Sequence, residues 1–370
     1  MSNYEKFHSQ TDTEVILKLY EKLGSDCVNQ LRGMFAFAIW DNLEKTAFIA
    51  RDPLGIKPLY YWQSEKTLIF ASELRTILAS GLPSVTINPE GIYGYLISGS
   101  VPEPDTLIKD IYCLEAGHFL QWKAGKVTQN QYWQIQFVPQ AIPKIEAIES
   151  VRKALIDSIK YHFVSDVPVG VFLSGGIDST ALVALARQTQ LGELHTYLIA
   201  FEEAQWIAQK IAHKFNTNHT EYKITSQIGR ELLGKFVEAI DQPSIDGFNT
   251  FCVSKIAREN GSKVVLSGLG GDELFGGYSS FQQVPKMVKW GQRMQWLQPF
   301  NIGNKLSKWT HKNKLQRLGD FLQQFPNTFN AYLCYRGIFT HTETQNILTH
   351  YFPEFSRACH QLSQMTAAAR

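Results

Sequence analysis

The chain has 370 residues, a net charge of +2, a hydrophobic content of 44% and a charged content of 19%. These values predict a globular protein of two domains, and the nearly balanced charge indicates no strongly acidic or basic partner. The sequence has no apolar run near the ~18 residues of a membrane span, and its polar start, MSNYEKFHSQ, is unlike a signal peptide. The scattered cysteines, without a C-x-x-C pair, favour reduced thiols in a cytoplasm over zinc ligands or disulfides.

The first part of the chain, residues 1 to about 137, predicts a mixed α+β layer. Residues Thr11–Leu23 carry apolar side chains at helical spacing, and Gly24 ends that helix. Four short strand-like runs separated by turns follow, and Ser72-Glu73 then opens a short helix. The predicted strands are Met34–Trp40, Thr46–Ala50, Pro58–Trp62 and Thr67–Ala71.

A stretch of low charge, Trp133–Ile142, predicts the boundary between a domain over 1–137 and one over 138–370. A helix is expected next, over Lys144–Phe163, because one stripe of its surface is apolar. That stripe consists of Ile145, Ile148, Val151, Leu155, Ile159 and Phe163.

The stretch VGVFLSGGIDS, residues 169–179, predicts a buried strand, a glycine turn and a helix over Thr180–Arg187. A helix that begins after such a turn presents backbone N–H groups and a positive dipole end, which together bind phosphate. Ser174 and Ser179 add hydroxyl donors, and Asp178 adds a carboxylate suited to Mg2+. An ordinary strand-to-helix turn is the alternative for the SGG triplet alone. The lysine of the G-x-x-x-x-G-K-[ST] loop is absent, which argues against γ-phosphate transfer.

Two further strands are predicted, His195–Phe201 and Lys263–Leu266, each preceded by a helix. This alternation indicates a parallel sheet, whose ligands bind beyond the carboxyl ends of the strands. A second glycine-rich loop, Ser267–Tyr278 (SGLGGDELFGGY), follows the last strand and carries Asp272 and Glu273. It can supply another carboxylate beside a bound nucleotide, although its glycines alone would also suit tight turns.

These segments resemble known enzymes. SGGIDS is similar to the pyrophosphate loop of ATP pyrophosphatases. TDTEVILKLYEKLG, LRGMFAFAIWD and ARDPLGIKPLYY look like the glutaminase domain of glutamine-hydrolysing asparagine synthetases, and the two glycine loops look like the synthetase domain of the same family. The resemblance covers nearly the whole chain. It implies a partial Ntn-type glutaminase sandwich, followed by a parallel-sheet ATP pyrophosphatase domain with a helical C-terminal part.

The resemblance also implies roles for individual residues. Asp178 and Asp272 would hold Mg2+ and pyrophosphate, and Asp12 would hold the amino group of glutamine, although a helix N-cap is the simpler interpretation of Asp12. The residues matching the family's ATP site are Leu173, Ser174, Gly175, Gly176, Asp178, Ser179, Ile199, Ser267 and Gly268.

The sequence departs from the family pattern in several places. The family's glutaminase nucleophile is a cysteine at the mature N-terminus, whereas this chain begins Met1-Ser2, so a truncated glutaminase domain without hydrolytic activity is expected. Leu269 replaces a glutamate associated with forming the aspartyl-adenylate. The segment after Phe201 is short, and the chain ends at Arg370 before the family's later helices, so an incomplete synthetase domain is expected.

The activity implied is that of a carbon–nitrogen ligase. ATP and Mg2+ would adenylate a carboxylate, normally that of L-aspartate, and ammonia rather than glutamine would give asparagine, AMP and pyrophosphate. An amidotransferase for another carboxylate and a vestigial nucleotide-binding fragment are the alternatives. A homodimer is left open, and no nucleic-acid partner is expected.

The segment from Leu274 to Gly319 contains no acidic residue but several basic ones and three tryptophans. A solvated helical face with the tryptophans packed inward is the first interpretation. A contact between residues 286–317 and an anionic surface is the second.

Overall fold

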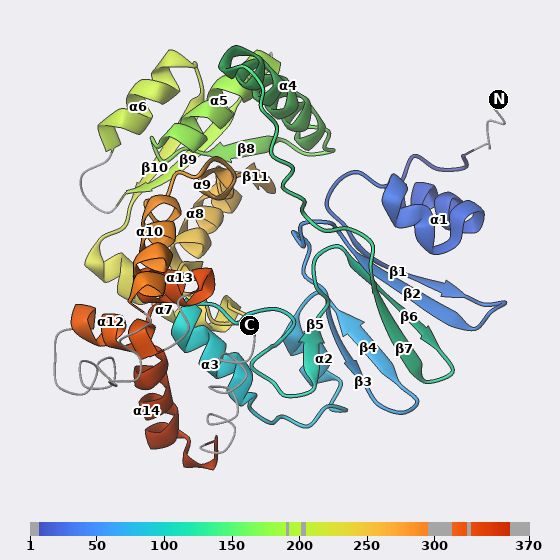
Figure 1. Cartoon of the computed structure of the whole chain (residues 1–370). Helices are drawn as coiled ribbons and strands as arrows, with labels where there is room; N and C mark the ends of the chain where they lie inside the picture. Colours follow the sequence, from blue (N-terminus) through green and yellow to red (C-terminus); the bar gives the residue numbers. More distant parts are fainter. Residues whose placement is uncertain (1–6, 190–191, 201–204, 295–312, 324–326, 356–370) are drawn as a thin grey trace. The chain divides into compact units, whose positions relative to one another are not determined.

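The computed structural model describes residues 7–189, 192–200, 205–294, 313–323 and 327–355. The chain divides into two compact units (Figure 1). The first unit comprises Met1–Val138 and His341–Arg370, and the second comprises Pro139–Thr340. Within the described ranges, no helix combines the length and apolar character needed to cross a membrane.

The first unit contains two antiparallel sheets. The larger has the strand order β1-β2-β6-β7, and the smaller has the order β4-β3-β5. The strands of the larger sheet are β1 (Ala36–Asp41), β2 (Thr46–Arg51), β6 (His118–Lys123) and β7 (Lys126–Gln131). Those of the smaller sheet are β3 (Tyr60–Gln63), β4 (Leu68–Ala71) and β5 (Ile111–Cys113).

Successive side chains along each strand point to opposite faces of its sheet, and both faces of each sheet pack against a neighbouring layer. One face of the larger sheet packs with Phe48 against helix α1 (Asp12–Leu23) and the following turn of helix, η1 (Gly24–Gln30). Its other face packs with Ile49 against the smaller sheet. The far face of the smaller sheet packs against helix α2 (Leu74–Ala79). The first unit therefore has four layers in the order helix, sheet, sheet, helix.

All four strands predicted in this unit are present, and their ends differ by two residues or fewer. Strands β5 to β7 and helix α3 (Pro89–Ser98) were not predicted. The interpretation of Asp12 as an N-cap is wrong, because the Thr11 side chain caps α1 by accepting a hydrogen bond from the Glu14 N–H. Helix α14 (His341–Tyr351), followed by the short η3 (Pro353–Phe355), contacts α3.

The second unit is built on a parallel sheet with the strand order β10-β9-β8-β11. Its strands are β8 (Val169–Phe172), β9 (His195–Ala200), β10 (Asn218–Lys223) and β11 (Val264–Leu266). The sequence predicted three of them. It missed β10 because the segment NHTEYK has no apolar run, as is common for a polar strand at a sheet edge.

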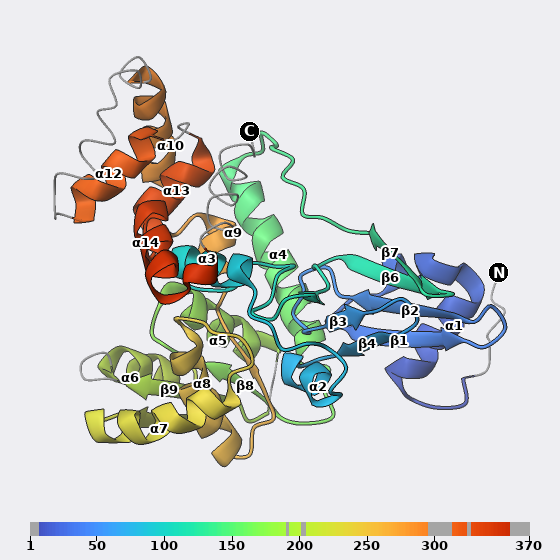
Figure 2. The ribbon, with the colours of Figure 1, turned by 90° about the horizontal axis from the view of Figure 1, so that it is seen from below.

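Helices cover both faces of the parallel sheet, as Figures 1 and 2 show. The face that carries Val171 packs against α4 (Lys144–His162), α5 (Ile177–Thr189) and α6 (Gln205–Lys214). The other face packs against α8 (Gly247–Glu259), and α7 (Ser226–Ala239) lies against α8. The other helices in the described part of this unit are α9 (Gly271–Phe275), α10 (Ser280–Arg293), α12 (Asn313–Gln323) and α13 (Thr328–Arg336).

The apolar stripe expected on α4 is only partly buried. Ile159 is 3% exposed in the core of the unit, whereas Ile145 and Ile148 are 74% and 57% exposed. Only the C-terminal turns of this helix therefore pack on the sheet.

Candidate active site

The strand order creates a switch point at the centre of the parallel sheet. From β8 the chain continues to β9 on one side, while β11 pairs with β8 on the other. Such a switch point forms a crevice beyond the carboxyl ends of the two neighbouring strands. A cavity of about 550 Å³ lies there, lined by residues of both glycine loops.

The loop after β8 leads directly into α5. Gly175 has a φ of +83°, which a residue with a side chain rarely adopts. The helix begins at Ile177, so the predicted start at Thr180 is wrong. Its first helical hydrogen bond runs from the Thr180 N–H to the Gly176 carbonyl (3.0 Å). The N–H groups of the first turn precede that bond, and they lie beside the cavity at the positive end of the helix.

The loop after β11 approaches the first loop closely because it lacks side chains at two positions. A Cβ atom on Gly268 would lie 3.1 Å from the Ser179 nitrogen, and one on Gly271 would lie 2.6 Å from a carboxylate oxygen of Asp178. Asp272, the residue after Gly271, also lines the cavity. The glycines therefore bring the carboxylates of two distant segments to one site.

The charged side chains that line this cavity are acidic: Asp178, Asp272 and Glu273. No lysine or arginine is among the lining residues that the structure describes. A phosphate group in such a site needs a cation to offset the carboxylates. Mg2+ fits this set of donors, because proteins commonly hold it with one or two carboxylates together with phosphate oxygens. In the described part of the chain no cluster of three or more metal-ligating side chains was found.

An aromatic side chain closes one wall of the cavity. Tyr278 donates a hydrogen bond to Glu273 (3.0 Å), and this bond raises the pKa of the phenol. The guanidinium of Arg336, on α13, lies 4.9 Å from the centre of the same ring. A cation over the ring face and a carboxylate on the hydroxyl together fix the orientation of this wall.

The structure brings most of the predicted nucleotide-site residues together. Ser174, Gly176, Asp178, Ser179, Ser267, Gly268 and Asp272 all line the cavity. Gly175, Leu173 and Ile199 are not among the lining residues. The Leu173 side chain is fully buried, and Ile199 packs in the core beneath the sheet.

Several lining residues were not predicted as site residues: Phe172, Ile177, Phe275 and Tyr278. Their positions inside or beside the two glycine loops were the only signal for them. Leu269 is 88% exposed at the cavity, so it does not pack against its own loop.

In the first unit, Asp12 lies exposed in the first turn of α1. Cys27 is fully buried, and its burial raises the pKa of its thiol, which makes it a poor nucleophile. The pKa of Cys113 is raised to about 12, also mainly by burial.

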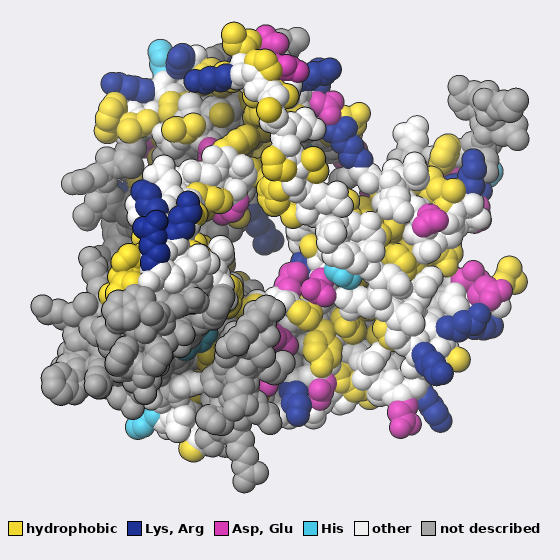
Figure 3. All heavy atoms as spheres, viewed as in Figure 1, with side chains coloured by type: hydrophobic (Ala, Val, Ile, Leu, Met, Phe, Trp, Pro, Cys, Tyr) yellow, Lys and Arg dark blue, Asp and Glu magenta, His cyan; other side chains and the backbone are white. Residues whose placement is uncertain are grey.

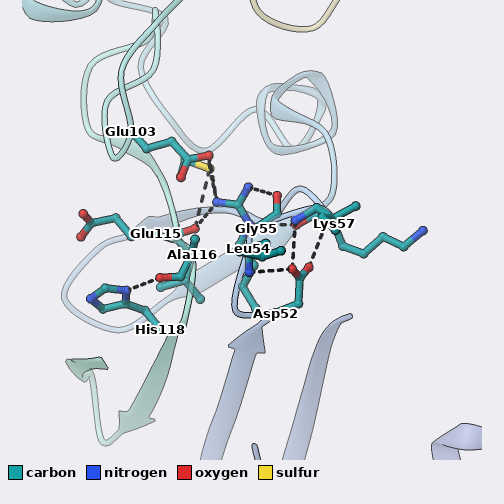
Figure 4. Close-up of polar contacts among 12 residues, drawn as sticks. Asp52, Leu54, Gly55, Lys57, Glu103, Glu115, Ala116 and His118 are labelled. Carbon is teal, nitrogen blue, oxygen red and sulfur yellow. Dashed lines mark hydrogen bonds and ion pairs between the residues drawn. The ribbon is translucent and has the colours of Figure 1, made fainter. Parts of the chain in front are cut away.

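The motif ARDPLGIKPLYY forms a tight loop held by two buried charges (Figure 4). Arg51 donates hydrogen bonds to the carbonyls of Lys57, Gly55 and Leu114 and forms a 3.0 Å ion pair with Glu103. Asp52 accepts the N–H groups of Leu54, Ile56 and Lys57. These contacts fix the conformation of the loop.

The described part of the basic segment lies mostly on α10, where basic side chains gather on the surface (Figure 3). Lys286, Lys289 and Arg293 are exposed, and Trp290 is 42% exposed rather than packed inward. Arg317 instead donates to the carbonyls of Gly337 and Ile338. Five other residues of the predicted basic segment lie outside the described residues: Trp296, Lys305, Lys308, Trp309 and Lys312.

Together, the three-layered unit and its cavity between two glycine loops define a doubly wound α/β protein with a ligand site at the switch point of its sheet. Residues 150–367, more than half of the chain, match the family model described as asparagine synthase. Residues 1–133 match the model described as a glutamine amidotransferase domain. The chain belongs to the asparagine synthase family.

Curated relatives agree with this assignment. A putative glutamine-hydrolysing asparagine synthetase 2 of Methanocaldococcus jannaschii is 41% identical over 289 residues, which are 74% of this chain and 56% of the relative. Asparagine synthetase 1 of Bacillus subtilis is 34% identical over 75% of this chain and 44% of its own length. The amidase chry2 of Gibberella zeae is 28% identical over the same two shares. The chain thus spans about half the length of the curated relatives it matches.

Proposed function

We propose that this chain is a carbon–nitrogen ligase of the asparagine synthetase type. ATP and the acceptor carboxylate would meet in the switch-point cavity and form an acyl-adenylate and pyrophosphate. Ammonia would then attack the acyl carbon, giving an amide and AMP. The carboxylate of L-aspartate is the acceptor that the names of the synthetase relatives favour.

One observation carries the proposal: two glycine loops, distant in sequence, converge with Asp178 and Asp272 on one cavity at the first turn of α5. The N–H groups of that turn and the hydroxyls of Ser174 and Ser179 would bind phosphate oxygens. Asp178 and Asp272 would hold Mg2+, whose charge would offset that of the triphosphate. The protein's own contribution is to position the reactants and exclude water from them.

The decisive experiment measures pyrophosphate release from ATP with ammonia and a panel of carboxylates. Release that depends on L-aspartate, with formation of asparagine, supports the proposal. ATP binding without release for any acceptor would instead support a vestigial nucleotide-binding protein. Replacing ammonia with glutamine in the same assay identifies the nitrogen source.

A different carboxylate is the second candidate acceptor, because Leu269 places an exposed apolar side chain at the cavity. An apolar surface suits a larger or less polar acceptor than aspartate. One matched relative, the amidase chry2 of Gibberella zeae, is not named as an asparagine synthetase, which leaves room for another acceptor.

For the first unit we propose an Ntn-type glutaminase fold. The support is its layering of helix, sheet, sheet and helix, together with the match of residues 1–133 to a glutamine amidotransferase model. Asp12 would bind the amino group of glutamine there. Binding of glutamine, lost in Asp12→Ala, is the test.

We also propose that the protein is located in the cytoplasm and that α10 contacts an anionic surface through Lys286, Lys289 and Arg293. We further propose that the protein forms a homodimer, which light scattering would measure.

A further inference from the structure

Helix α6 forms the wall behind the nucleotide loop. A Cβ atom on Gly175 would lie 3.1 Å from Cγ2 of Ile207 and 3.5 Å from the backbone nitrogen of Ala208. Ala208 is fully buried and shares a core cluster with Val171 and Leu173 of the strand that leads into the loop. Any movement of α6 toward or away from the sheet therefore changes the space available to Gly175.

A chain of polar contacts attaches α6 to the sheet. Gln209 of α6 donates a hydrogen bond from Nε2 to Oε2 of Glu221 on β10 (2.8 Å). Oε1 of Glu221 lies 3.0 Å from Nε2 of His219, and Nδ1 of His219 lies 2.8 Å from Oγ1 of Thr196. Thr196 is fully buried on β9, and its hydroxyl contacts that of Thr217 (2.9 Å).

Both carboxylate oxygens of Glu221 have a partner in this chain, Gln209 at Oε2 and Nε2 of His219 at Oε1. At the other end of the chain, the Thr217 hydroxyl donates to the carbonyl oxygen of Ala212 on α6 (3.5 Å). The Glu221 side chain is only 16% exposed and that of His219 only 10%, so water competes weakly for the bond between them. The Gln209 side chain, in contrast, lies on the surface.

We propose that Gln209, Glu221 and His219 are positioning residues for the nucleotide loop, which they hold in place through α6. The inference rests on the proposed function, because the loop is taken to bind the phosphates of ATP. The apolar contacts of α6 include the small Ala208 and Ala212, which tolerate sliding of the helix. Hydrogen bonds are directional, and the bond to Glu221 therefore fixes where the helix lies along β10.

The experiment compares Gln209→Ala and Glu221→Ala with the unaltered chain. Glu221→Gln is the conservative variant, since Gln209 can flip its amide to pair with the new side chain. Glu231→Ala is the matched control, because it removes a similar Gln227–Glu231 bond (3.2 Å) on the exposed face of α7. Gln209 is exposed, so its truncation leaves the core intact.

Two quantities are measured for each variant: hydrogen exchange of a peptide covering residues 173–180 without nucleotide, and the Kd for Mg-ATP. We expect both Ala variants of the chain to exchange faster in this peptide and to bind Mg-ATP about tenfold more weakly. Glu221→Gln and Glu231→Ala should match the unaltered chain in both measurements. Circular dichroism confirms that each variant is folded.

Unchanged loop exchange in folded Gln209→Ala and Glu221→Ala would overturn the inference, whatever the ATP affinity. Faster loop exchange with equal ATP affinity would also overturn it, because the loop position would then not matter for binding. An unaltered chain that binds no Mg-ATP would contradict the proposed function, while the exchange data would still decide whether α6 holds the loop.

Discussion

At the scale of single residues, the cavity depends on glycines that remove steric barriers between carboxylates. A side chain on Gly271 would collide with Asp178, and a Cβ atom on Gly277 would lie 1.9 Å from Oδ1 of Asp272. The carboxylates are the only charged side chains among the described lining residues. Removing them should therefore weaken ligand binding rather than destabilise the core.

We expect Asp178→Ala to reduce ATP-dependent pyrophosphate release to background while the protein stays folded. The carboxylate lies outside the buried strand, so its loss removes a ligand for Mg2+ without creating a core cavity. Release is measured at saturating ATP, and folding by circular dichroism. Asp166→Ala, an exposed carboxylate before β8, is the control and should behave like the unaltered chain. Release at the normal rate in Asp178→Ala would exclude Asp178 from the site.

We expect Leu269→Glu to raise the rate with L-aspartate relative to other carboxylates. The side chain is 88% exposed, so the introduced carboxylate stays hydrated and the melting temperature should not fall. The ratio of rates with aspartate and with larger carboxylates is the measurement. Leu274→Glu, at a 64% exposed position that does not line the cavity, is the control. A folded Leu269→Glu variant with the original ratio would show that position 269 does not select the acceptor.

At the scale of elements, the site depends on how one loop fits between α5 and α6. The turn at Gly175 needs a positive φ, and the space beside it is filled by Ile207. Because α5 begins at Ile177, three residues earlier than its apolar pattern indicates, Asp178 and Ser179 belong to the first helical turn. Their position is thus set by the helix and not by a mobile loop.

Gly175→Ala should destabilise the second unit by about 1–3 kcal/mol, since the left-handed conformation costs a side-chain residue roughly 1–2 kcal/mol and the new methyl group crowds Ile207. Affinity for Mg-ATP should fall in the same variant. Urea unfolding and calorimetric titration are the measurements.

Gly234→Ala is the matched control, because nothing lies within 4 Å of its Cβ position in α7. It should stabilise the protein by about 0.5–1 kcal/mol, as alanine does in an exposed helix. Equal stability of the two variants would show that the turn at Gly175 is not constrained.

At the scale of the whole molecule, each unit has its own hydrophobic core. The clusters around Phe48 and Ile77 lie in the first unit, and the cluster around Val171 lies in the second. A ligand of the second unit should therefore stabilise that unit selectively.

We expect Mg-ATP at about 100 times its Kd to slow hydrogen exchange in β8, β9 and α5. Binding at that concentration raises the free energy of unfolding of the second unit by up to ~2.7 kcal/mol. Exchange in β2 and β6 of the first unit should change little. Exchange mapped by mass spectrometry with and without Mg-ATP is the measurement, and ADP without Mg2+ is the control for the role of the metal. Equal protection of both units would mean that they unfold as one.

The sequence by itself determined the parallel α/β character of the second unit, four strands of the first unit and both glycine loops. Each of these features follows from a pattern in contiguous residues. The patterns are apolar runs such as Val169–Leu173, apolar residues at helical spacing, and clusters of glycine where the chain turns. The same local signals failed for β10, whose polar residues lie at a sheet edge. The roles of Leu173 and Ile199 came from the family resemblance and remain predictions; the Leu173 side chain is fully buried, and Ile199 packs against a core cluster.

Only the tertiary structure decided the strand order, and with it the switch point that brings Ser174 and Ser267 to one cavity. The approach of Gly271 to Asp178 and the chain from Gln209 to Thr196 were likewise invisible in the sequence. The physical reason is that each joins residues from separate segments, whose proximity follows from how strands pair and helices pack and not from any local pattern.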